Sequence, residues 1–336
     1  MQSQEESTVS TLVTGSLSLI LTSIAVPLVR WAALRWGFLD RPDGYLKPQA
    51  GAVPYGGGIA VVVGTSCALL WVRPVLLAIP IAGALLVLVL GVVDDSVGVR
   101  PVWRLVAGLV AGSTLLALWP VTLLQLPARL LMGTCCAILA SAAMNAINMT
   151  DGSDGLSGTV SLLAAAGLLV GWSLAGQGAL ANVAAATCGG IAGFLIFNWP
   201  PARIYLGDAG AYWIGFVLTA LCIPALSSWH AVIGVMCVMA LLEIELLASV
   251  LRRLRGHHGL ATGDRRHIYD VVHLRLGQSA TKIDVLYGLV GVISSGVGIL
   301  VWRGETVILG LVWLAALSML VVLLYRWSAC RKVVVR

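Results

Sequence analysis

Carboxylates that close or open long apolar runs are the residues in this sequence best suited to do chemistry. Asp94 and Asp95 close one run, Asp151 and Asp154 follow a second, and Asp208 opens a third. Taken alone, the Asp94–Asp95 pair also fits a solvated helix end. Carboxylates gathered on one face, however, are the oxygen ligands of a hard cation, and Mg²⁺ combines a few of them with substrate phosphates. The pattern therefore indicates phosphoryl-group chemistry.

The second acidic segment, NAINMTDGSDGLSG, repeats polar side chains at three-residue steps: Asn145, Asn148, Asp151 and Asp154. In a helix this spacing places neighbours on one face. Its glycines favour a tight turn through which a ligand can approach the backbone closely. An ordinary interfacial loop has the same composition, but the recurring spacing argues against that alternative.

The third segment, FNWPPARIYLGDAGAYWIG, ends one helix at its two prolines and begins another near Asp208. We expect Asp208 to cap the new helix, a role compatible with metal binding. Asn198 and Arg203 add an amide and a fixed positive charge to the same loop, and both suit a diphosphate-containing ligand.

A basic segment, RRLRGHHGLATGDRRHIYDVVHLRLGQS, concentrates Arg and His where an anionic substrate would need them. Contact with anionic lipid is the alternative interpretation. Just before it, Glu243 and Glu245 lie seven to ten residues before Arg252 and Arg253, which favours internal pairing over catalysis.

The elements that must position these residues are membrane-spanning helices. Of 336 residues, 59% are hydrophobic and only 11% are charged, too few to cover a soluble globule. A bilayer core of ~30 Å needs about 20 apolar residues per helix. The apolar runs predict an all-α polytopic membrane protein, one integral membrane domain over residues 1–336, with eleven spans near 9–32, 56–72, 74–92, 101–119, 129–147, 159–175, 180–197, 209–226, 229–250, 284–302 and 305–326.

Basic residues orient these spans. With the N-terminus outside, the external connections hold three of the 21 Lys and Arg residues (Arg73, Arg129 and Arg303), which leaves eighteen inside. This positive-inside asymmetry explains the net charge of +6 without nucleic acid, and it places the acidic segments on the cytoplasmic face of the inner membrane. Glu5 and Glu6 precede the first run in place of a basic segment, so we expect a retained helix. The seven cysteines lack metal-site or disulfide spacing and are interpreted as packing residues.

Together these segments resemble the polyprenyl-phosphate N-acetylhexosamine-1-phosphate transferases, glycosyltransferase family 4, over nearly the whole chain. The resemblance rests on LDRPDGYLKPQAGAVPYGGG, on the Asp94–Asp95 pair with Arg104 downstream, on the second and third acidic segments, and on the basic segment around His267. Each motif is weak alone, but five of them in order are highly specific.

The resemblance implies an activity and a set of roles. A UDP-sugar and polyprenyl phosphate would be the substrates, membrane lipid the surroundings, and Mg²⁺, or Mn²⁺ in its place, the cofactor; a homodimer is compatible with the family. The implied metal ligands are Asp208, Asp94, Asp95 and Asp151, with Asp94 as the base. The implied catalytic residues are Asp94, Asp95, Asp151 and His267, and the implied substrate-binding residues are Lys47, Arg104, Asn148, Asp154, Asn198, Arg265 and Arg266.

Two departures from the family pattern narrow the choice of branch. Gln49 stands where much of the family has His, and Tyr269 and Asp270 replace two further histidines. The missing histidines disfavour the peptidoglycan branch and favour O-antigen or another surface polysaccharide, and we expect Asp270 to face a sugar hydroxyl, Arg265 or Arg266.

Two other classes of membrane protein would show different arrangements of carboxylates. An ion-coupled transporter would place its carboxylates near the midplane, and a CDP-alcohol phosphotransferase would carry a tight aspartate motif on two helices.

Overall fold

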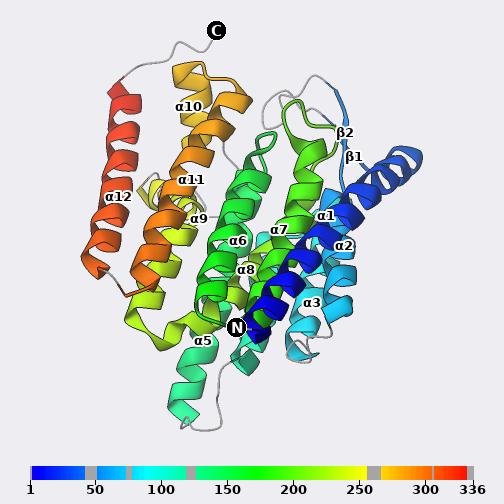
Figure 1. Cartoon of the computed structure of the whole chain (residues 1–336). Coiled ribbons are helices and arrows are strands. Elements are labelled where there is room, and N and C mark those ends of the chain that lie inside the picture. The colour runs from blue at the N-terminus through cyan, green and yellow to red at the C-terminus, as the bar shows by residue number, and fades with distance from the viewer. Residues whose placement is uncertain are drawn as a thin grey trace.

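A computed structural model describes residues 2–41, 51–72, 78–118, 126–255, 266–304 and 306–330 (Figure 1). The described chain is almost entirely helical, as the sequence predicts. Its α-helices are α1 (Gln2–Trp36), α2 (Gly57–Val72), α3 (Ala78–Val97), α4 (Pro101–Ser113), α5 (Leu126–Thr150), α6 (Leu156–Leu174), α7 (Gly178–Asn198), α8 (Gly207–Cys222), α9 (Trp229–Arg255), α10 (Ile268–Leu276), α11 (Ala280–Trp302) and α12 (Val307–Cys330). Short 3₁₀ turns extend α4 over Thr114–Leu118 and α8 over Ile223–Ser227.

Each of the eleven predicted spans corresponds to a helix. Ten helices within the described ranges are long and apolar enough to cross a membrane, and α2 is a shorter apolar helix. The chain is therefore a polytopic membrane protein. The predicted boundaries differ most at α1, which begins seven residues before the predicted span, and at α3 and α9, which each end five residues after it.

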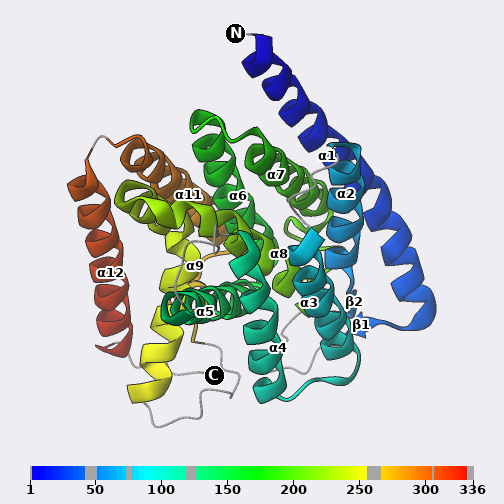
Figure 2. The ribbon, with the colours of Figure 1, turned by 90° about the horizontal axis from the view of Figure 1, so that it is seen from below.

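Helix α8 is the centre of the bundle. It lies among α2, α3, α5, α6 and α7 (Figure 2) and packs against each of them. Nearly all of its side chains are buried. Helix α3 approaches it closely at Gly91, where an added Cβ would lie 2.3 Å from the Cα of Ala209. This contact of backbone with backbone needs a glycine. It brings the end of α3, with Asp94 and Asp95, beside the beginning of α8.

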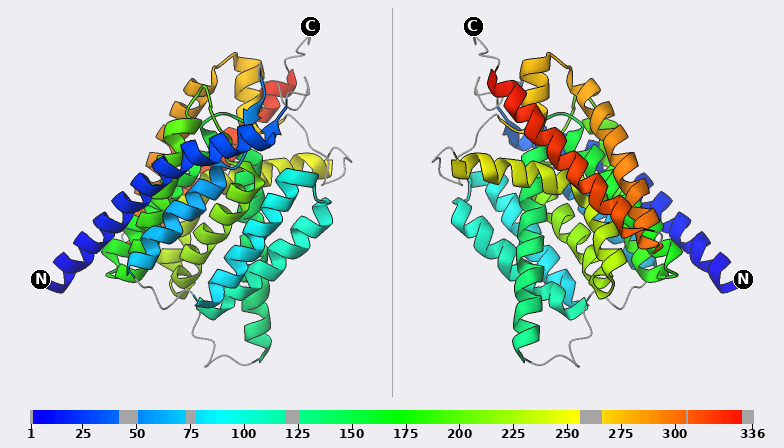
Figure 3. Two further views of the ribbon diagram at one scale, coloured as in Figure 1. Left: turned by 90° about the vertical axis from the view of Figure 1, so that its right-hand side faces the viewer. Right: turned by 90° about the vertical axis from the view of Figure 1, so that its left-hand side faces the viewer.

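Two small elements add to the predicted helices. Strands β1 (Leu39–Asp40) and β2 (Val53–Pro54) form an antiparallel pair, with Leu39 opposite Pro54. Helix α10 lies at the same end of the bundle as this pair, while the beginning of α1 projects away from the other helices (Figure 3). We call the end that carries β1, β2 and α10 the site end, because every predicted site residue that the structure describes lies there or at a helix terminus that contacts it.

Candidate functional site

The beginning of α8 is the point at which the predicted carboxylates meet. The backbone N–H of Gly207 donates to Asp151 Oδ2 at 3.1 Å, and the N–H of Asp208 donates to Asp95 Oδ1 at 2.8 Å. The N–H of Ala209 donates to Asp95 Oδ2 at 3.2 Å. The first N–H groups of a helix have no partner within it and carry its positive dipole end. Carboxylates from two other segments therefore satisfy this terminus.

Asp208 does not cap its own helix, so that expectation was wrong. Helix α8 begins at Gly207, which makes Asp208 a first-turn residue, and Leu206 occupies the N-cap without a side-chain hydrogen bond. The capping acceptors come from Asp95 and Asp151. The side chain of Asp208 is instead bonded by the amide of Asn148 at the end of α5.

Asp94 is buried, unlike the partly exposed Asp95, Asp151 and Asp208. Its Oδ2 accepts the hydroxyl of Tyr212 at 2.7 Å and lies 2.7 Å from Nε of Arg104. Its Oδ1 accepts the N–H of Val99 at 2.8 Å. These three donors hold the carboxylate in one orientation next to Asp95. Arg104 also donates to the carbonyl of Val99, which ties the α3–α4 connection to the site.

Asp151 lies in the turn between α5 and α6, partly exposed. The hydroxyl of Ser157 donates to its Oδ1 at 2.7 Å. Burial raises the pKa of the Asp151 carboxyl to about 7; the Ser157 and Gly207 donors lower it, and the charges of Asp95 and Asp40 raise it further. The smaller effect of the Asp95 and Asp40 charges is a repulsion between carboxylates that a bound cation would reduce.

Asp154 and Asn198 form a second group beside the carboxylates. Asp154 Oδ2 accepts the N–H of Ala202 at 2.9 Å. Asn198 is buried; its Oδ1 accepts the N–H of Gly155 at 3.1 Å, and its Nδ2 donates to the carbonyl of Ile204 at 2.9 Å. The loop from α7 to α8 and the turn from α5 to α6 are thereby fixed to each other.

His267 begins α10 and is buried. Its Nδ1 lies 3.0 Å from the hydroxyl of Ser249 on α9, and its ring stacks on Tyr269 with centroids 5.4 Å apart. The hydroxyl of Tyr269 donates to the carbonyl of Met149 at 3.1 Å. Since Met149 lies two residues before Asp151, α10 is docked onto the same end of α5 that carries the carboxylate cluster.

Two acidic residues hold α10 in place, in ways the sequence did not predict. Glu245 accepts the N–H of Ile268 at 3.2 Å and the hydroxyl of Tyr287, so it holds α10 and α11 where pairing with Arg252 or Arg253 was expected. Asp270 is buried and accepts the N–H of His267 at 3.3 Å. Asp270 thus caps its own helix, and its expected contact with a sugar hydroxyl, Arg265 or Arg266 stays a prediction.

The remaining predicted contacts are not all described. The carbonyl of Arg266 accepts from Arg252 and from the Tyr325 hydroxyl, while Arg266 itself is exposed at the site end. Lys47 and Arg265 lie outside the described residues.

The donor set fits a cation that is shared with substrate. Among the described residues, no three His, Cys, Asp or Glu side chains already form a metal-holding group. Asp95, Asp151 and Asp208 nevertheless meet at one helix terminus, are partly exposed, and are held by N–H and amide donors. Such an arrangement suits Mg²⁺, which binds through a few carboxylates and completes its coordination with waters and phosphate oxygens.

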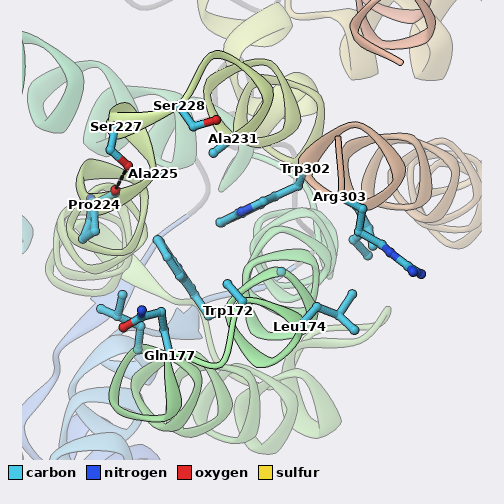
Figure 4. A pocket seen from close by; sticks show the side chains of 14 residues that line it. Trp172, Leu174, Gln177, Pro224, Ala225, Ser227, Ser228, Ala231, Trp302 and Arg303 are labelled. Carbon is cyan, nitrogen blue, oxygen red and sulfur yellow. Dashed lines mark hydrogen bonds between the residues drawn. The ribbon is translucent and has the colours of Figure 1, made fainter. Parts of the chain in front are cut away.

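A cavity of about 470 Å³ lies at the other ends of the helices, away from the carboxylates. Trp172 and Trp302 extend into it, edge to face at 4.8 Å, with Gln177 and Ser228 nearby (Figure 4). None of the predicted site residues lines it.

Sequence reasoning missed several residues that hold the site. Tyr212 follows Asp208 by four residues on α8, so helical spacing could have placed it on the same face. Ser157 and the N–H of Ala209 carry no comparable signal, because hydroxyl and backbone donors occur throughout the chain.

Comparisons with known proteins place this arrangement in context. Residues 77–226 match the model of Glycosyl transferase family 4. The chain is 24% identical to a Bacillus subtilis protein named "Probable undecaprenyl-phosphate N-acetylglucosaminyl 1-phosphate transferase", over 88% of this chain and 86% of that protein. It is 30% identical to a phospho-N-acetylmuramoyl-pentapeptide-transferase of Mycobacterium tuberculosis, over 54% of this chain and 53% of that protein. The matched family region contains Asp94, Asp95, Asp151 and Asp208.

Proposed function

Because this chain belongs to the polyprenyl-phosphate hexosamine-1-phosphate transferase family, glycosyl transferase family 4, we propose that it transfers N-acetylhexosamine 1-phosphate from a UDP-sugar to undecaprenyl phosphate. An oxygen of the lipid phosphate attacks the β-phosphorus of the UDP-sugar. The bond from this phosphorus to the bridging oxygen of UMP breaks, and UMP leaves. The products are polyprenyl diphosphate sugar and UMP.

The observation that carries the proposal is the meeting of three carboxylates from three separate segments at the beginning of α8. Asp95 and Asp151 accept three consecutive N–H groups of this helix, and Asp208 lies between those groups. Phosphoryl transfer depends mainly on positioning and on neutralising phosphate charge. The same helix terminus supports both requirements, since its dipole and N–H groups also favour anions.

The residues would act as follows. Asp94, fixed by Tyr212 and Arg104, would accept the remaining proton of the lipid phosphate or hold its attacking oxygen. Asp154 would bind the nucleoside end with Asn148, while His267 would contact the diphosphate or sugar. Mg²⁺, when bound to Asp208, Asp95 and Asp151, would supply charge neutralisation at the transferred phosphate.

The finer assignment rests on composition and sequence. The basic residues on the same side as the carboxylates support an active site on the cytoplasmic face of the inner membrane. Tyr269 and Asp270 in place of histidines favour a donor other than the peptidoglycan precursor. The product would be the first lipid intermediate of O-antigen or another surface polysaccharide.

One assay tests the proposal. Purified protein in detergent is given undecaprenyl phosphate, Mg²⁺ and each of a panel of UDP-sugars, and UMP release is followed. We expect UMP from at least one UDP-N-acetylhexosamine and none without the lipid phosphate. Excess EDTA should stop turnover, and Mg²⁺ or Mn²⁺ should restore it. If no donor yields UMP, the proposed reaction is wrong; full turnover in EDTA would remove the metal from it.

A further inference from the structure

Asp284, in the first turns of α11, is a buried carboxyl group that the proposed reaction does not use. Only 1% of the residue is exposed, and neither carboxyl oxygen has a hydrogen-bond partner among the described residues. A buried polar group without a partner lowers stability and calls for a specific explanation. Capping of α11 does not explain Asp284, because the hydroxyl of Ser279 already caps this helix by accepting the N–H of Lys282.

The carboxyl lies against the turn that carries Asp154. An added Cβ on Gly155 would be 2.3 Å from Asp284 Oδ2 and 3.0 Å from Cδ of Pro200. Gly155 also has a φ of +76°, where residues with a side chain are strained. Gly155 therefore packs closely between the side chains of Asp284 and Pro200.

The other restraints on this turn are hydrogen bonds. The N–H of Gly155 donates to Asn198, Asp154 accepts the N–H of Ala202, and the hydroxyl of Tyr205 also bonds to Asp154. These contacts hold the Asp154–Gly155 turn against the end of α7 and the α7–α8 loop. From α11, the side chain of Asp284 touches the turn at Gly155, and the charge of Asp154 acts on it.

An ionised carboxylate in this place would be buried without a donor and would be close to a second carboxylate. The neutral form lowers both costs, because it carries no charge to bury and is not repelled by Asp154. We propose that Asp284 is a positioning residue for the nucleotide end of the site: in its neutral form it fixes the Asp154–Gly155 turn and thereby strengthens binding of the UDP-sugar. This inference rests on the proposed function for its substrate, but the placement of the turn can be tested without one.

Two variants of the full-length protein separate shape from polarity. Asp284→Leu keeps the branching at Cγ but is larger and removes the polar group, whereas Asp284→Asn is neutral, polar and has nearly the shape of Asp. Ser295→Ala is the matched control, because Ser295 donates to the carbonyl of Leu163 across the same α6–α11 interface but further along it. All three should fold with a thermal midpoint close to that of the wild type, since Asp284→Leu removes an unpartnered buried group.

Hydrogen exchange and steady-state kinetics give the readouts. In Asp284→Leu, the amides of residues 151–155 should exchange at least about 5-fold faster. The KM for the UDP-sugar should rise about 10-fold, with kcat and the KM for undecaprenyl phosphate within about 3-fold of wild type. Asp284→Asn and Ser295→Ala should stay within about 3-fold of wild type in every measurement.

The inference is overturned by unchanged exchange in Asp284→Leu, by an Asn variant as impaired as the Leu variant, or by equal changes in both KM values. Absence of UMP release from the wild type would instead refute the proposed reaction, and the exchange measurement would still decide whether Asp284 fixes the turn.

Discussion

Asp95 and Asp208 lie side by side but hold different partners, and so their isosteric variants should differ. Asp95 accepts two backbone N–H groups of α8, whereas Asp208, among the described residues, accepts from the side-chain amide of Asn148. Asp208→Asn should keep the thermal midpoint of the wild type and lose turnover by about 10³-fold, because an amide weakens metal binding at the developing charge. Asp95→Asn should lower both, since its NH₂ group would face a backbone donor.

UMP release and thermal unfolding of the purified variants check this difference. Thr219→Val, on the same helix but toward its other end, is the control and should retain turnover. Turnover of Asp208→Asn within tenfold of the wild type would remove Asp208 from the site.

The raised pKa of Asp151 predicts competition between protons and the metal. Its pKa in the folded protein is about 7, above that of an unfolded aspartate, so the carboxyl holds a proton below this pH. The apparent affinity for Mg²⁺ should therefore weaken as the pH falls through 7. Titrating Mg²⁺ against UMP release at several pH values measures this.

The same pKa has a consequence for the metal-free protein. A folded-state pKa above the unfolded value stabilises the protein fully at low pH, and this contribution is lost as the pH rises from about 4 through 7. The thermal midpoint in EDTA should fall over this range, and less so in Asp151→Asn. A midpoint with the same pH dependence in both proteins would contradict the assignment.

The sequence predicted that these polar residues lie close together, but it did not predict their hydrogen-bond partners. The three-residue spacing correctly joined Asn148 and Asp151 to one locality, yet Asn148 bonds Asp208 while Asp151 bonds the N–H of Gly207. Backbone donors are identical at almost every residue. The pairing of carboxylates with the beginning of α8 therefore depends on how the helices pack, which spacing alone does not encode.

Among the elements, α10 shows what hydropathy does not detect. Its nine residues lie inside a basic segment, too short and too polar to be read as a span. Its beginning is held by a tertiary contact from Glu245 and by a local one from Asp270, each of which accepts an N–H group. The eleven apolar runs, by contrast, needed only length and composition to be recognised.

Glu245 links three helices, so its removal should disturb α10 as a unit. Glu245→Ala would leave the N–H of Ile268 and the hydroxyl of Tyr287 without their acceptor. We expect faster hydrogen exchange throughout α10, a lower thermal midpoint, and turnover reduced at least ~10-fold because His267 moves with the helix. Hydrogen exchange resolved by peptide, with UMP release on the same sample, tests this.

Glu243→Ala is the matched control for Glu245→Ala, because it removes a neighbouring carboxyl of α9 that makes no hydrogen bond to α10 among the described residues. It should leave exchange in α10 unchanged. If both variants behave alike, the effect belongs to α9 and the proposed link through Glu245 is wrong.

For the whole molecule, the distribution of basic residues predicts which end of the bundle faces the cytoplasm. Three basic residues in external connections against eighteen elsewhere predict that Ser153 and Thr262 lie inside and that Ser227 lies outside. Single cysteines at these positions, in a background without reactive native cysteines, are labelled in intact cells with an impermeant maleimide. Labelling only at Ser227 is expected; labelling at Ser153 would reverse the orientation.

Hydropathy identified the spans but not their places in the bundle. The most apolar window of α12 has a mean hydropathy of 2.8 and is 11% buried, whereas that of α8 has 1.8 and is 89% buried. Lipid and protein interior are both apolar, so overall hydropathy cannot distinguish a central helix from a peripheral one. Small residues at close contacts, such as Gly91 against Ala209, carry that information only once the partner is known.

The position of α8 also bears on how the protein is made. Helices enter the membrane in chain order, and the N–H partners of Asp95 lie 113 and 114 residues after it. A nascent chain that has inserted α1 to α7 already carries Asp94, Asp95, Asp151 and Asp154, but it lacks the helix terminus around which they are arranged. The site can therefore assemble only after α8 has been synthesised and has inserted between helices that entered the membrane before it.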